Sequence, residues 1–202
     1  MSLDTISYRN YTIELEPDTD AGSPREWANV GEILYTSCRY NLGDRRTTRD
    51  EIKEITERDD VIFLPVYAYI HSGVALNTTG FSCPWDSGQC GIIWCTKETA
   101  VKEWGKTLCT KTVREKAEKY LRGEVETLSA YFAGEVVGYI VRDPEGEEIE
   151  SCWGFYPEGD NYNYAISEAK AQINWHRKDK AKRLKAERLA SRLEREQHLA
   201  LV

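Results

Sequence analysis

The C-terminal segment constrains the fold most, because residues 165–201 contain neither glycine nor proline. Alanine, leucine, lysine, arginine and glutamate dominate this segment, and all five favour the helical conformation. We therefore expect one long helix, or two helices in succession, at this end of the chain. Apolar residues follow helical steps there but are too sparse to indicate a coiled coil (Ala186, Leu189, Leu193 and Ala200).

The preceding segments alternate between strand-like and helix-like patterns. Aromatic and β-branched residues predict strands at residues 8–15, 30–40, 61–70, 74–77 and 91–96. Pro65 indicates an edge or a bulge in the third of these. Residues 135–142 and 149–155 flank a turn of the type that joins β-hairpins, Asp143-Pro144-Glu145-Gly146. Apolar residues at helical spacing predict helices at 48–58, 97–104 and 110–132.

Together these patterns predict an α+β fold with an antiparallel-leaning sheet, helices on one side, and a long basic C-terminal helix. We expect an α+β core domain at residues 1–160 and a helical basic extension at residues 161–202. A chain of 202 residues, 41% of them hydrophobic, is large enough to bury one good core.

The sequence shows no membrane or export signal. No apolar run approaches the roughly 20 residues that a transmembrane helix needs, and the N-terminal residues lack the pattern of a signal peptide. We therefore expect a soluble protein of the cytoplasm with no membrane partner. Thiols are kept reduced in that compartment, so the six cysteines are predicted to be free.

The net charge of −7 hides an asymmetry between the two parts of the chain. Residues 175–202 carry nine Lys and Arg against four Asp and Glu, a balance of +5, which leaves −12 for residues 1–174. An acidic body repels phosphate, but it could compete for a basic surface that normally holds nucleic acid.

The basic tail has two interpretations. It fits contact with phosphate or an acidic partner, and it also fits a solvated helix carrying ion pairs at i,i+4 spacing. The basic residues singled out for a nucleic-acid contact are Arg177, Lys178, Lys182, Arg183, Lys185 and Arg188.

The segment His71–Cys95 combines one histidine, three cysteines, an aspartate and two tryptophans with several glycines. Such a mixture is typical neither of a core nor of a plain solvated loop, and we predict a functional site here. As a rigid recognition surface it would use Trp85, Asp86, Ser87, Gln89 and His71. Alternatively, Asp86 and Ser87 only cap a turn, while Trp85 and Trp94 pack in the core.

The same segment supplies the parts of a thiol enzyme. Cys83 would be the nucleophile, His71 the base and Asp86 the group that orients it; Cys90 is a second nucleophile candidate. The papain-type spacing is not matched, and the strand-like Gly91–Thr96 gives a thiolate no helix N-terminus. The other two histidines, His176 and His198, lie in the tail.

No metal or cofactor is predicted. The spacing of Cys83, Cys90 and Cys95 fits a zinc site poorly. The sequence has no glycine-rich phosphate-binding motif of the nucleotide-binding types.

Five ordered blocks between about residues 20 and 157 resemble a family of small, uncharacterised bacteriophage and mobile-element proteins. The blocks are Ser23–Gly31, Arg39–Asp44, His71–Gly73, Cys83–Gln89 and Ser151–Phe155. The family pattern has SPRxWDNLG, RYxLGD, HSG, CPWDSGQ and SCWGF at these places. This chain departs from it at Ala28-Asn29-Val30, where the pattern has Asp-Asn-Leu, and so lacks one carboxylate. The basic tail lies outside the resemblance.

The resemblance implies a phage or mobile-element protein that binds a host protein. We expect an inhibitor or modulator of host nucleic-acid or defence machinery, of the anti-CRISPR or antirestriction type, whose partner is a CRISPR effector or another defence nuclease. Two alternatives are a small cysteine/histidine-dependent hydrolase and a nucleic-acid-binding accessory protein that acts through the basic tail.

Overall fold

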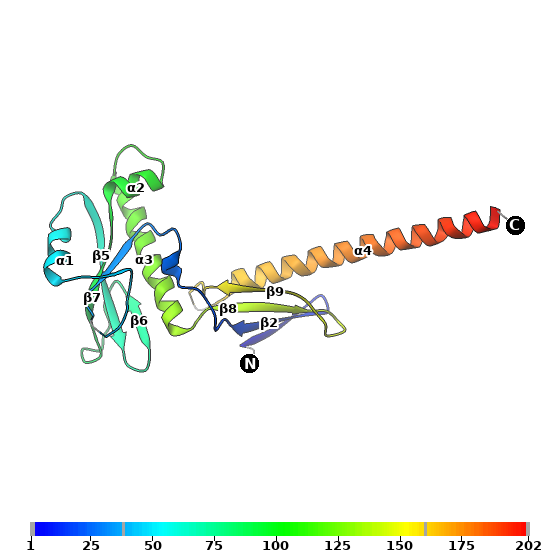
Figure 1. Cartoon of the computed structure of the whole chain (residues 1–202), viewed down its shortest axis with the longest axis horizontal. Helices are drawn as coiled ribbons and strands as arrows, with labels where there is room; N and C mark the ends of the chain where they lie inside the picture. The colour runs from blue at the N-terminus through cyan, green and yellow to red at the C-terminus, as the bar shows by residue number, and fades with distance from the viewer. Residues whose placement is uncertain (1–2, 38, 160, 201–202) are drawn as a thin grey trace. The chain divides into compact units, whose positions relative to one another are not determined.

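The computed structural model describes residues 3–37, 39–159 and 161–200, and the chain falls into two compact units. Residues 19–136 form one unit, and residues 1–18 together with 137–202 form the other. The sequence instead suggested a core at 1–160 and an extension at 161–202. The division differs because the N-terminal strands pair with strands that follow residue 136. Figure 1 shows the elements of both units.

The discontinuous unit is a four-stranded antiparallel sheet, with the strand order β1-β2-β8-β9. Its strands are β1 (Asp4–Tyr8), β2 (Tyr11–Pro17), β8 (Val137–Arg142) and β9 (Glu148–Phe155). The run at 8–15, predicted to be one strand, is in fact broken by a two-residue turn. Arg9 and Asn10 have φ values of 54° and 67°, which is the geometry of a tight hairpin turn.

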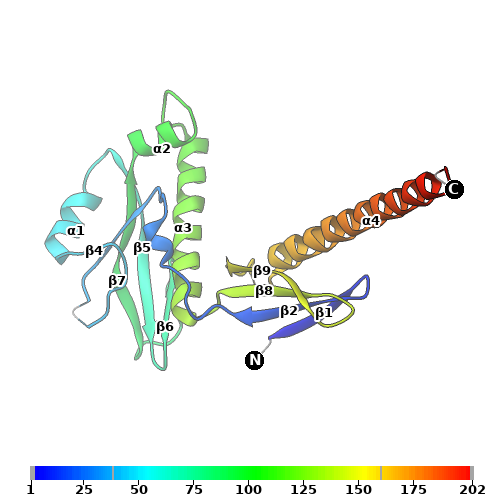
Figure 2. The same ribbon diagram turned by 45° about the vertical axis from the view of Figure 1, so that its right-hand side comes forward.

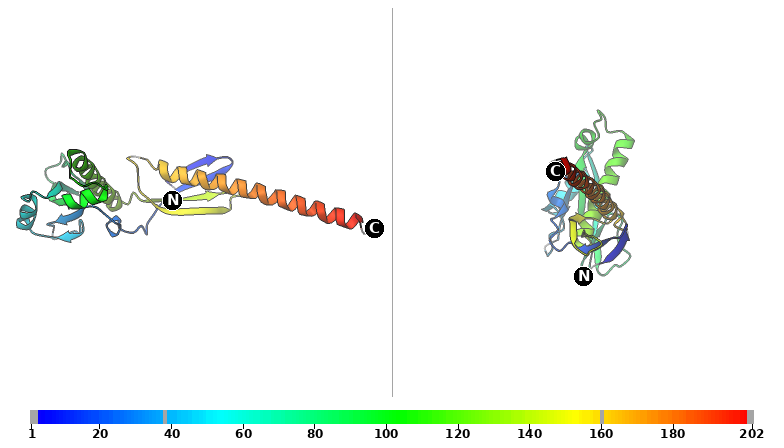
Figure 3. Two further views of the ribbon diagram at one scale, coloured as in Figure 1. Left: turned by 90° about the horizontal axis from the view of Figure 1, so that it is seen from above. Right: turned by 90° about the vertical axis from the view of Figure 1, so that its right-hand side faces the viewer.

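The long helix α4 (Asn163–Ala200) is one unbroken helix, and its first turns cover one face of this sheet. Ala165, Ala169 and Ile173 recur every four residues and are fully buried against Ile13 and Tyr139. Beyond His176 the helix leaves the sheet, and every side chain described from Lys180 onward is exposed. Figure 3 shows this free part of α4 extending past the strands.

The second unit holds a five-stranded sheet with the order β4-β3-β7-β5-β6. Its strands are β3 (Glu32–Tyr35), β4 (Arg45–Arg46), β5 (Val61–Ile70), β6 (Val74–Asn77) and β7 (Ser87–Thr96). Only the β3–β4 pair is parallel. Pro65 lies one residue before the register shift at Val66/Tyr67, so the bulge that it indicated is confirmed.

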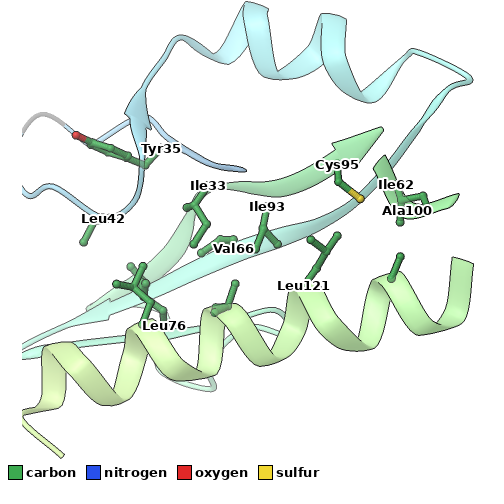
Figure 4. Close-up of a cluster of buried hydrophobic side chains, with 14 of the residues drawn as sticks. Ile33, Tyr35, Leu42, Ile62, Val66, Leu76, Ile93, Cys95, Ala100 and Leu121 are labelled. Atoms are coloured by element: carbon green, nitrogen blue, oxygen red, sulfur yellow. The ribbon is translucent and has the colours of Figure 1, made fainter. Parts of the chain in front are cut away.

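The helices of this unit pack on both faces of the sheet, as Figure 2 shows for α1 and α3. The unit contains the 3₁₀ turn η1 (Pro24–Glu26) and the helices α1 (Arg49–Thr56), α2 (Lys97–Glu103) and α3 (Lys111–Ala133). Leu121 of α3 packs toward Ile93 on one face (Figure 4). Ile55 of α1 packs against Leu34 and Ile92 on the other.

The α+β class, the antiparallel pairing and the long basic C-terminal helix are thus confirmed. Two details differ from the expectation: the strands form two sheets, and the larger sheet has helices on both faces rather than on one side. The second detail follows from β5 and β7, which carry apolar side chains on both faces of the sheet, so both faces need to be covered. None of the helices in the described part of the chain is both long and apolar enough to cross a bilayer.

Candidate functional site

His71, Cys83 and Asp86 meet where β5 ends and β7 begins. The Ile70 amide donates to the Asp86 carbonyl at 2.8 Å, which holds the two chain segments side by side. One oxygen of the Asp86 carboxylate, Oδ2, contacts both other residues. His71 Nδ1 lies 3.4 Å from it, and Cys83 Sγ lies 3.9 Å from it. The structure thus brings these three residues together, although no pattern in the sequence indicated that His71 lies next to this loop.

The order of these contacts differs from that of a thiol enzyme. The carboxylate stands between the thiol and the imidazole, and the Cys83 thiol is oriented to donate to it. A cysteine nucleophile is activated by contact with the base itself, with the carboxylate behind the base. The His71 ring is instead stacked beside Tyr69, with ring centroids 6.4 Å apart. This arrangement stabilises a turn more directly than it activates sulfur.

Trp85 stands at the apex of this turn and is 91% exposed. The interpretation that placed it in the core is wrong, because none of the described elements covers its indole. The hydroxyl of Ser87 donates to the Cys83 carbonyl and closes the turn beneath Trp85. Trp94, in contrast, is half-buried beside α1 and donates its indole N–H to Glu32 Oε2 at 3.1 Å.

Ser87 and Gln89 belong to β7 and not to the loop in which the sequence placed them. β7 begins at Ser87, since Ser87 pairs with Tyr69 and Gln89 with Tyr67. Gln89 lines a separate hollow of about 280 Å³ next to Cys90 and Thr36. We call residues 83–87 the Trp85 turn, because the hydrogen bonds of Cys83 with Asp86 and Ser87 connect them.

Cys90 and Cys95 are not activated thiols. Burial raises the pKa of Cys90 to about 11 and that of Cys95 to about 11 as well. Such thiols carry almost no thiolate near neutral pH. Cys109 is half-buried and Cys152 exposed, while Cys38 lies outside the described residues. Within that same part of the chain, no three His, Cys, Asp or Glu residues are grouped so that they could hold a metal ion.

The nine Lys and Arg residues of α4 from Arg177 onward are all exposed, and their helical positions are uneven. At 3.6 residues per turn, seven of the nine cations fall within an arc of roughly 140°. We call these seven the basic face: Arg177, Lys178, Lys182, Lys185, Arg188, Arg192 and Arg195. Arg183 lies off this arc and pairs with Asp179 at 2.7 Å. A second i,i+4 ion pair on this helix joins Arg192 and Glu196 at 2.8 Å, as the alternative of a solvated helix with such pairs expects. His176 contacts Tyr11 Oη at 3.2 Å, and the side chain of His198 is outside the described part.

Sequence reasoning missed a buried ionic cluster that connects the first two resemblance blocks. Arg25, from the first block, forms two hydrogen bonds with the carboxylate of Asp44, from the second block, at 2.9 and 2.7 Å. Its third nitrogen donates to Glu124 of α3 at 2.9 Å. Although burial lowers the pKa of Arg25, the hydrogen bonds to Asp44 and Glu124 raise it further, to above its ordinary value.

A groove of about 530 Å³ lies beside this cluster, between residues 24–29 and α3. Its lining includes the aromatic residues Trp27, Trp104 and Tyr120, and it also includes Lys116 and Lys119. These residues are far apart in sequence, so no local pattern predicted the groove. The one available signal was the charged Arg25 and Asp44 inside blocks of small and aromatic residues.

Comparisons with known proteins give no further assignment. No protein-family model, curated protein or solved structure matches this chain.

Proposed function

We propose that this chain is a binding protein that recognises a protein partner through the Trp85 turn. The observation that carries the proposal is the 91% exposed indole of Trp85 on a closed turn. Exposing a large aromatic ring to water is unfavourable, and tryptophan is the residue most enriched among the energetic centres of interfaces. Because the turn is already held by Ser87 and Asp86, binding would cost little conformational entropy.

The class of partner follows from charge and from the resemblance to phage and mobile-element proteins. Residues 1–18 and 137–174 contain 12 acidic and 3 basic residues, a balance of −9, so the acidic excess is concentrated in the part of the discontinuous unit that precedes residue 175. An acidic surface can occupy a basic site that normally holds nucleic acid. We therefore propose a host nucleic-acid or defence protein in the bacterial cytoplasm, a CRISPR effector or restriction nuclease, as the target.

Trp85→Ala tests this proposal against a matched control. Trp175→Ala removes another exposed indole, 63% accessible, from α4. Affinity capture from host lysate with the intact chain and with Trp175→Ala should recover a nuclease or guide-RNA effector, and the Trp85→Ala bait should lose it. The purified target should then be inhibited in cleavage by the intact chain and not by Trp85→Ala. Equal capture and inhibition by Trp85→Ala would refute the role of the turn.

A second candidate function is nucleic-acid binding through α4, and the basic face favours it. Changing Lys182, Lys185 and Arg188 to Gln removes three of its cations. Each lost phosphate contact should reduce the slope of log affinity for duplex DNA against log salt by roughly 0.9 in magnitude, so the loss of three contacts should reduce it by about 2.7. Lys180→Gln with Arg183→Gln is the control, because these cations lie off the basic face. Equal losses in both variants, or no gel shift with the intact chain, would reject this function.

A further inference from the structure

The groove between residues 24–29 and α3 has a rigid floor. Glu124 Oε1 accepts hydrogen bonds from the amides of Val30 and Gly31 at 2.8 and 3.2 Å, and Oε2 accepts from Arg25. The same segment is held from within by Asn29, whose side chain donates to the Pro24 and Trp27 carbonyls. The groove is therefore formed before any ligand arrives, which reduces the entropy cost of binding.

The walls of the groove present aromatic surface. Trp27 is 54% exposed on one side. On the other side Trp104 meets Tyr120 edge-to-face, with centroids 6.2 Å apart. Gly123 of α3 also lines the groove, and a Cβ placed there would meet no atom within 4 Å. The missing side chain leaves room for a flat group against the helix.

The charge of the groove is positive, although the chain as a whole is acidic. Lys116 and Lys119 project from adjacent positions of α3, and no ion pair of either is found among the described residues. The one carboxylate in the lining, Glu124, is already matched by Arg25. Ala28 lines the groove at the position where the resembled pattern has Asp, so this chain lacks a carboxylate that would have offset part of the positive charge.

A second hollow of about 220 Å³ continues the groove toward the start of α3. The two hollows share Trp104 and Lys116, and the second adds Lys106. A volume of about 530 Å³ matches that of sites for small ligands, which span about 300–1,000 Å³.

We propose that this groove binds a phosphorylated aromatic heterocycle, that is, a nucleotide unit. The base stacks between Trp27 and Tyr120 over Gly123, and the phosphate is held by Lys116 and Lys119. Aromatic stacking next to cations is the general mode by which proteins hold unpaired nucleotides. The unit comes either from a free mononucleotide or from single-stranded nucleic acid, which would continue along the second hollow past Lys106. This site is independent of the Trp85 turn.

Titration of the full chain tests the proposal, with calorimetry as one readout and tryptophan fluorescence, to which Trp27 and Trp104 contribute two of the six indoles, as the other. The probes are adenosine 5′-monophosphate, a short oligodeoxythymidine, adenosine and inorganic phosphate. Saturable quenching by the monophosphate, by the oligonucleotide or by both supports the site and identifies the source of the nucleotide. Equal affinity for adenosine or phosphate alone, or no saturation with either nucleotide probe, overturns it.

Variants separate this groove from other surfaces. Lys116→Gln with Lys119→Gln should raise Kd about tenfold or more, as expected for loss of charge-assisted hydrogen bonds. Gly123→Leu should abolish binding by filling the groove, while its better helix propensity keeps α3 folded. Ala28→Asp should weaken binding through charge alone.

Lys111→Gln is the matched control, because Lys111 lies on the same helix and pairs with Glu115 at 3.8 Å. It should leave Kd unchanged, as should Gln at Lys185 and Arg188 on the basic face. If Gly123→Leu remains folded by circular dichroism and still binds, the groove is not the site. If the Lys185 and Arg188 changes remove binding, α4 holds the probe and the proposal fails.

Discussion

The side chain of Arg25 is only 9% exposed, and every nitrogen of its guanidinium donates a hydrogen bond. Nε and Nη2 donate to Asp44, Nη1 donates to Glu124, and Nη2 donates to the Gly31 carbonyl as well. The carboxylates are shared in turn, since Asp44 also accepts from the Ile33 amide at 2.6 Å. Charges removed from water are tolerated only when they are paired and hydrogen-bonded in this way. The cluster therefore fixes residues 24–33 against α3.

Removing Arg25 alone should be costly, because it leaves the buried carboxylate of Glu124 and the partly exposed one of Asp44 without their cation. We expect Arg25→Met to lower the free energy of unfolding by about 3–5 kcal/mol. Arg45→Met is the control: Arg45 also has two carboxylate partners, Glu32 and Glu51, but its side chain is 46% exposed. Its loss should be much smaller. Urea unfolding followed by tryptophan fluorescence measures both, and similar losses would contradict the argument.

The cysteines should differ in reactivity according to burial. With pKa values near 11, Cys90 and Cys95 hold little thiolate at pH 8, and their alkylation should speed up only as pH rises toward 11 or the chain unfolds. Iodoacetamide labelling with peptide mapping should modify Cys152 first and protect these two. Labelling of Cys83 far faster than Cys152 would instead favour the cysteine hydrolase.

At the scale of elements, the sequence predicted best what is encoded locally. The helices α1, α2 and α3 begin directly after Thr48, Thr96 and Thr110, whose hydroxyls cap the first turn, and the predicted starts lie within a residue of these. The turn at Arg9-Asn10 was missed because its left-handed backbone is not marked by a glycine.

Non-local features were less accessible. β7 extends back to Ser87 only because Tyr67–Tyr69 of β5 pairs with it, and Ser-Gly-Gln alone favours a loop. The contact of His71 with Asp86 depends on the same pairing. The groove needs Trp27, Trp104 and Tyr120 from three separate segments. The residues of the Trp85 turn were thus identifiable from composition, but their contacts were not.

The close approach of β8 and β9 depends on one glycine. A Cβ at Gly138 would stand 2.1 Å from the ring of Trp153, so the indole lies directly on the strand. Gly138→Ala should destabilise the sheet by about 1–3 kcal/mol through overpacking, and much less in a Trp153→Ala background. Gly88→Ala is the control, since a Cβ there meets nothing within 4 Å. Thermal unfolding of Gly138→Ala, Trp153→Ala, the double variant and Gly88→Ala measures the interaction free energy between Gly138 and Trp153. Additive effects would show that these two residues do not compete for space.

At the scale of the whole molecule, the chain leaves the first sheet at Asp18 and returns to it at Val137, so residues 19–136 are an insertion. Pro17 and Val137 are directly opposed partners on β2 and β8. Opposed residues in antiparallel strands lie about 5 Å apart. The two ends of the insertion are therefore adjacent, which is the arrangement that tolerates excision of a domain.

Each unit should fold without the other. Residues 1–17 joined to 137–202 by Asn-Gly should give a four-stranded sheet with α4, because a two-residue turn spans opposed strands. Residues 19–136 should fold alone around their own core. Circular dichroism and cooperative thermal unfolding of each fragment test this; a fragment that unfolds without cooperativity would show that the insertion and its host depend on each other.

The insertion also delays the pairing of β2 with β8 during synthesis of the chain. β1 and β2 leave the ribosome first, but β8 follows only after the whole of residues 19–136, a delay of roughly ten seconds at ordinary translation rates. During that interval one edge of β2 lacks its partner strand. The apolar side chains of Tyr11, Ile13 and Leu15 stay uncovered even longer, until α4 has been synthesised. An isolated hairpin is marginal in water, and an open strand edge invites mispairing. Glu14 and Glu16, which alternate with these apolar residues, supply the charge that keeps the waiting strand from aggregating until the last helix arrives.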